Sequence, residues 1–67
     1  MHINLTKEEK SYIIEVWHIS KVHSHKRYER LLYTARWFIK KYPIYKEYSK
    51  SIYLLIDDET QIIKGIL

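Results

Sequence analysis

Residues 26–42 repeat their apolar side chains at the spacing of an α-helix, and this pattern constrains the fold more than any other feature of the chain. At ~100° per residue, one side of such a helix is apolar along its whole length. That side carries Tyr28, Leu31, Leu32, Ala35, Phe38, Ile39 and Tyr42. An apolar stripe of this width predicts a helix that packs against other parts of the chain.

The opposite side of the predicted helix combines cations with aromatic rings. We take seven residues there as the candidate binding surface: Lys26, Arg27, Arg30, Tyr33, Trp37, Lys40 and Lys41. A helix that only covers a core does not need a tryptophan and a tyrosine one turn apart on its polar side. The alternative is that Tyr33 and Trp37 pack beneath the C-terminal segment or in a dimer seam, with lysine stems covering them.

A second helix is predicted over residues 6–22. Thr6 and Glu9 have the spacing of a capping box, in which each side chain bonds the backbone amide of the other residue. Apolar residues then recur on one face of the helix, and Ile14 is an outlier on its polar side. We interpret that outlier as a contact with a second copy of the chain.

We expect the two helices to form a hairpin rather than one continuous rod. A helix running from residue 6 to residue 42 would be ~55 Å long and would leave much of its apolar stripe uncovered. Ser24 lies in a stretch without strong helix formers and is able to cap a second helix. The prediction is therefore a helical hairpin of residues 6–22 and 25–42.

The C-terminal third is open to more than one interpretation. Pro43 ends the second helix, and we expect one helical turn after it. Residues 51–56 and 61–66 are rich in β-branched side chains around a polar turn, which predicts a β-hairpin. The expected fold class is therefore mainly α, of the α+β kind. The alternative is an all-α fold of three helices, because Pro43 suits a first helical position and a helical face then carries Ile44, Tyr45, Tyr48, Ile52, Leu55 and Ile56. Residues 57–65 can also be read separately as a short helix capped by Asp57.

Length and composition bound the class of protein. The chain has 67 residues and no cysteine, which predicts one small domain, residues 1–67, without disulfides. A chain of this size buries only ~60% of its surface, so we expect a homodimer. There is no apolar run long enough to span a membrane and no signal-peptide pattern. We expect an intracellular, cytoplasmic protein that does not associate with membranes.

Positive charge is concentrated in the middle of the sequence. The whole chain has a formal charge of +4. Residues 26–50 hold eight lysine and arginine side chains against two glutamates, which gives +6 for this segment alone. Such a segment attracts anionic partners, most often nucleic acid, although a lysine-rich surface can also serve only solubility.

The polar residues do not form a recognisable catalytic set. His18, His23 and His25 do not have the i, i+4 spacing that places two metal ligands on one helical face. The acidic run of residues 57–59 lacks other convergent polar groups, and we interpret it as a turn or a helix cap. We therefore expect neither an enzyme nor a metal or cofactor site.

Two functions remain after these exclusions. The first is a small basic accessory or regulatory protein that binds nucleic acid, DNA in particular, through residues 26–42. The alternative is a protein-binding inhibitor or adaptor, of the kind that viruses and mobile elements direct against host machinery and that would act in the host cell. Trp, Tyr and Arg are enriched at the binding hot spots of such proteins.

Overall fold

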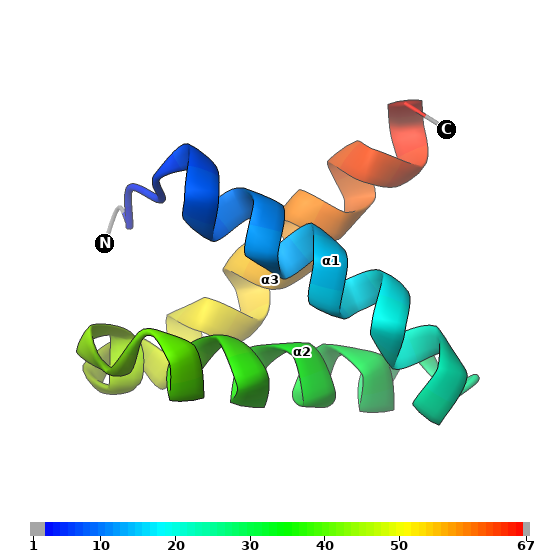
Figure 1. The fold of residues 1–67 in the computed structure, drawn as a ribbon, viewed down its shortest axis with the longest axis horizontal. Coiled ribbons are helices and arrows are strands. Elements are labelled where there is room, and N and C mark those ends of the chain that lie inside the picture. The colour runs from blue at the N-terminus through cyan, green and yellow to red at the C-terminus, as the bar shows by residue number, and fades with distance from the viewer. Residues whose placement is uncertain (1–2, 67) are drawn as a thin grey trace.

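The computed structural model describes the backbone of residues 3–66 and the side chains of residues 3–58. This part of the chain is helical except for residues 3–6, 24–26 and 42, and it contains no strand. Three α-helices are joined by a short turn and by a 3-10 helix (Figure 1). In chain order the elements are α1 (Lys7–His23), α2 (Arg27–Lys41), the 3-10 helix η1 (Pro43–Tyr48) and α3 (Ser49–Ile66). No helix of the described residues is both long and apolar enough to cross a membrane.

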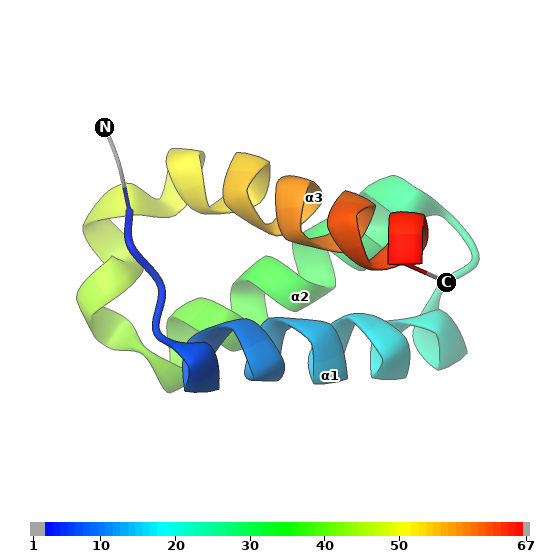
Figure 2. The same cartoon turned by 90° about the horizontal axis from the view of Figure 1, so that it is seen from above.

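The arrangement of the three helices leaves one side of α2 uncovered. Each helix contacts the other two. Helices α1 and α3 cross each other on the same side of α2 (Figure 1), and the view from above shows them flanking it (Figure 2). The outward side of α2 is therefore available to a partner.

The core lies where the three helices meet. Its fully buried members come from every helix: Ile13 from α1, Ala35 and Phe38 from α2, and Ile52 and Ile56 from α3. Tyrosine rings of the α2–α3 connection close one side of this core. The centroids of Tyr42 and Tyr45 lie 5.1 and 5.2 Å from that of Phe38.

The predicted start of α1 is confirmed. The Thr6 hydroxyl accepts the Glu9 amide N–H at 3.1 Å, and Glu9 Oε1 accepts the Thr6 amide N–H at 2.8 Å. These two bonds form the capping box and satisfy donors that the first turn of a helix otherwise leaves unpaired. Ile14, which we expected to mark a contact with a second copy, is half-buried within the single chain.

The turn predicted near Ser24 is present, but Ser24 is not the N-cap of α2. Lys26 holds that position and makes no side-chain capping bond. The Ser24 hydroxyl instead accepts the Lys26 amide N–H at 3.2 Å and donates to the carboxylate of Glu29. Ser24, two residues before the N-cap, thus holds the turn between α1 and α2 in place through these hydrogen bonds.

The predicted β-hairpin of residues 51–56 and 61–66 is wrong, because both segments lie in the single helix α3. A tight hairpin favours glycine or asparagine at its turn, and the intervening Asp-Asp-Glu-Thr contains neither. A helix places Ile52 and Ile56 one turn apart on one face, and both are fully buried against α1 and α2. Packing therefore outweighs local β preference here. Asp57, proposed as a cap, lies in the interior of the helix.

Candidate nucleic-acid interface

The orientation of α2 differs from the one that the apolar pattern predicted. Tyr28, assigned to the apolar stripe, is 71% exposed, whereas Thr34 is fully buried and donates its hydroxyl to the Arg30 carbonyl at 2.8 Å. At ~100° per residue the buried side is turned by about 50° from the predicted one. The side opposite the buried one carries Glu29, Tyr33, Arg36 and Lys40.

Arg30 does not belong to the outward surface, contrary to our prediction. Its guanidinium carbon lies 4.0 Å from the ring centroid of Trp17 in α1. Its Nε donates to the Ser20 hydroxyl at 3.2 Å, and one terminal nitrogen donates to the Trp17 carbonyl at 3.0 Å. Burial lowers the pKa of Arg30 from its ordinary value. This side chain joins α2 to α1.

Two further predicted cations contact the neighbouring helices. Lys41 Nζ lies 4.1 Å from the ring centroid of Tyr12 in α1. Arg27 forms an ion pair with Asp57 of α3. These contacts hold both side chains at the edges of α2, so their charges are partly engaged within the fold.

Tyr33 and Trp37 are brought together with His23 in a line that we call the aromatic row. The His23 and Tyr33 rings stack, with centroids 5.1 Å apart and planes inclined by 23°. Trp37 follows at 6.0 Å from Tyr33 and is 40% exposed. Lys40 ends the row, with its ammonium 4.9 Å from the Trp37 ring centroid. The row begins at the last residue of α1 and continues along α2.

The structure places exposed cations beside this row. Lys26, Arg36 and Lys40 are all exposed. Among the described side chains, none of the three forms an ion pair. We did not predict Arg36 as a binding residue. With Tyr28 counted in the apolar stripe, the predicted orientation of the helix placed Arg36 near the edge of the polar side. Because Thr34 is buried instead, α2 is rotated about its axis so that Arg36 faces solvent.

An open hollow lies between the end of α1 and the first half of α2. Its lining consists of His23, Ser24, Glu29, Leu32, Tyr33 and Arg36. Glu29 is held by its hydrogen bond from Ser24 and contributes a negative charge, while Arg36 contributes a positive one. The hollow is therefore apolar and aromatic in its walls and has both an acceptor and a donor at its rim.

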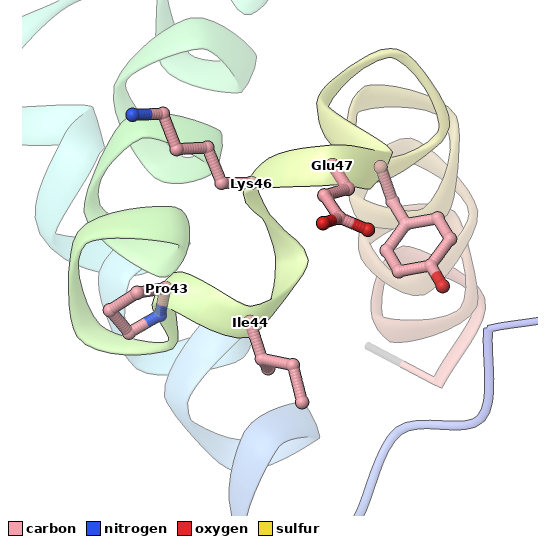
Figure 3. Close-up of a pocket in the computed structure, with 5 residues that line it drawn as sticks. Pro43, Ile44, Lys46 and Glu47 are labelled. Carbon is pink, nitrogen blue, oxygen red and sulfur yellow. The ribbon is translucent and has the colours of Figure 1, made fainter.

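Other surface features of the described residues do not suggest chemistry. The hollow at η1 is lined by Pro43, Ile44, Lys46, Glu47 and Tyr48, and Figure 3 shows Lys46 extending away from Glu47. Its polar groups do not converge on a common point, as a reaction site would require. No group of three histidine or acidic side chains within the described part of the chain is placed to hold a metal ion.

Comparison of the chain with protein families, with curated proteins and with solved structures finds no match.

Proposed function

We propose that this protein binds nucleic acid through the outward side of α2. The proposal depends chiefly on one observation: Arg36 and Lys40 are exposed beside the exposed ring of Trp37, without an acidic partner among the described side chains. Lys26 adds a third cation at the start of the helix. Arginine and lysine on one helix face neutralise phosphates and supply most of the non-specific affinity for nucleic acid.

The charge distribution around α2 supports this proposal. The only acidic residue within α2 is Glu29, and the Ser24 hydroxyl already bonds its carboxylate. An approaching polyanion therefore meets two or three cations for one carboxylate on this face. Arg36 and Lys40 lie one turn apart on this face and act together on an approaching phosphate, whereas Lys26 lies near the other end of the helix.

The alternative is that the outward side of α2 binds a protein, and the binding experiment must distinguish the two kinds of partner. Trp37 lies between Tyr33 and Lys40, and aromatic residues with neighbouring cations also form protein hot spots. The two partners differ in their response to salt. Phosphate binding releases counterions and weakens steeply with salt, whereas a hot-spot interface depends mainly on buried area.

The experiment is a titration of the protein into a labelled random-sequence duplex and a labelled single strand at several salt concentrations. We expect the logarithm of the binding constant to fall linearly with the logarithm of salt. For two or three neutralised phosphates the slope should be about −1.8 to −2.7 on the duplex and about −1.4 to −2.1 on the single strand, because each phosphate contributes ~−0.9 or ~−0.7 respectively. Absence of binding to either probe at low salt would exclude the proposal and favour a protein partner.

We also propose that the protein acts inside the cell as a homodimer. Three aliphatic side chains of the described part of the chain are more than two-thirds exposed: Val22, Ile44 and Leu54. A domain of this size gains stability when such side chains are covered by a second copy.

A further inference from the structure

We infer that the nucleic acid bound by this surface is single-stranded, and that an unpaired base stacks at the aromatic row beside Trp37. This inference rests on the proposed function and deepens it, because it names the form of nucleic acid that the surface selects. In a duplex the faces of the bases are covered by their neighbours. Only an unpaired base offers a free face to an aromatic side chain.

Stacking within the aromatic row limits where a base can bind. The His23 and Tyr33 rings lie against each other, with centroids 5.1 Å apart, and the Trp37 ring follows 6.0 Å from Tyr33. A base therefore does not enter between His23 and Tyr33, and the row offers a ring face at its Trp37 end.

Trp37 is the ring best placed to receive a base. One face of Tyr33 is already occupied by His23, and Tyr33 is half-buried. Trp37 is more exposed, and among the described side chains only the ammonium of Lys40 lies over its ring. A base that stacks on the indole displaces this ammonium, which then lies within reach of the phosphate attached to the same nucleotide.

The hollow beside the row has the electrostatic character of a base site rather than a phosphate site. The carboxylate of Glu29 in its lining repels phosphate, whereas it can accept a hydrogen bond from an N–H group on the edge of an unpaired base. Arg36 in the same lining can donate to a base or to the backbone. We therefore place the phosphates along Arg36 and Lys40 and the neighbouring base over the hollow.

The test compares three labelled probes of equal length and equal charge per strand at one salt concentration. They are an oligothymidine strand, a strand in which every base is replaced by an abasic residue, and a duplex. The wild-type protein should bind oligothymidine about 5- to 150-fold more tightly than the abasic strand, which is the contribution of one stacked base. It should also bind oligothymidine more tightly than the duplex.

Variants of two exposed aromatic residues on the same helix provide the control. Trp37→Ala should bind the abasic strand and oligothymidine with nearly equal affinity, while Trp37→Phe should retain most of the preference. Tyr28→Ala, which removes an exposed ring outside the row, should retain all of it. Circular dichroism should show the same helix content in all three variants.

The outcomes separate this inference from the proposed function. Equal affinity of the wild type for oligothymidine and the abasic strand, or tighter binding of the duplex, would overturn the inference and leave nucleic-acid binding in place. Failure of all three probes to bind at low salt would overturn both.

Discussion

The guanidinium of Arg30 in α2 lies against the indole of Trp17 in α1, 4.0 Å from its centroid, and bonds the Trp17 carbonyl at 3.0 Å. This one side chain therefore contacts both the ring and the backbone of the same residue. Its Nε also bonds the buried hydroxyl of Ser20. The contact fixes the rotation of α2 about its axis, and that rotation determines which residues face solvent.

We first predict that Arg30→Ala destabilises the fold. The substitution removes a cation–π contact and two hydrogen bonds that the charged guanidinium donates, which together are worth about 2 kcal/mol. In a domain of this size, the melting temperature should fall by on the order of 10 °C. Thermal unfolding followed by circular dichroism measures the change.

Arg36→Ala is the matched control for that prediction, because Arg36 is an arginine of the same helix that faces solvent. Its free energy of unfolding should change by no more than about 0.5 kcal/mol. Equal melting temperatures for the two variants would contradict the structural role assigned to Arg30.

A second prediction concerns the core. Phe38 has no exposed surface and contacts the tyrosines of the α2–α3 connection, so Phe38→Ala should cost ~3–5 kcal/mol. Because small domains have little stability to lose, the variant should be largely unfolded at room temperature. Leu32→Ala, at a half-buried position, should remain folded. Urea unfolding measures both variants, and a stable Phe38→Ala protein would show that the core is misplaced.

A third prediction follows from a buried acid at the start of α1. Burial by itself would raise the pKa of Glu9, but hydrogen bonds from Thr6 and Tyr45 outweigh it and hold that pKa below its ordinary value of 4.5. The same interaction raises the pKa of Tyr45 to about 12, so below that pH its hydroxyl keeps its proton and can donate to the charged Glu9. Glu9 thus joins α1 to η1 through its charged form.

The stability supplied by Glu9 should depend on pH in a defined direction. Because the folded-state pKa is depressed, the contribution is present above the ordinary value of 4.5 and is lost as pH falls through the folded-state value. We expect Glu9→Gln to reduce the loss of stability between about pH 6 and pH 3, in urea unfolding experiments. Glu8 is an exposed neighbour, and Glu8→Gln should lose as much stability over this pH range as the wild type does.

The fourth prediction is that the protein self-associates. Covering exposed Val22 and Leu54 removes apolar surface from water at ~25 cal/mol per Å². Sedimentation equilibrium at high micromolar concentration should give a mass of two chains or more. A monomer mass under those conditions would contradict the prediction.

The first two helices could be predicted from sequence because their ends carry local signals. Thr6 and Glu9 mark the start of α1, and Pro43 marks the end of α2. The third helix could not be predicted with the same assurance. Its first residues favour strands locally, and only the burial of Ile52 and Ile56 against the other helices decides in favour of a helix.

The arrangement of the proposed binding surface could be predicted in part. Tyr33, Trp37 and Lys40 were identified by their position on the helix, and the structure brings them together with His23. Arg36 was missed because the apolar pattern, which included Tyr28 and left out Thr34, placed it near the edge of the polar side. Thr34 is buried with its hydroxyl bonded to a backbone carbonyl, and this pairing makes burial of the polar group tolerable. A spacing rule does not reveal such pairing.

The most direct test of the central claim, that the outward side of α2 binds nucleic acid, is the salt dependence of binding for two single-charge variants. Arg36→Ala removes a cation of that side, and Lys50→Ala removes an exposed cation at the start of α3. The slope of log binding constant against log salt should become shallower by roughly one phosphate equivalent for Arg36→Ala and remain unchanged for Lys50→Ala. Identical slopes for the wild type and Arg36→Ala would contradict the claim.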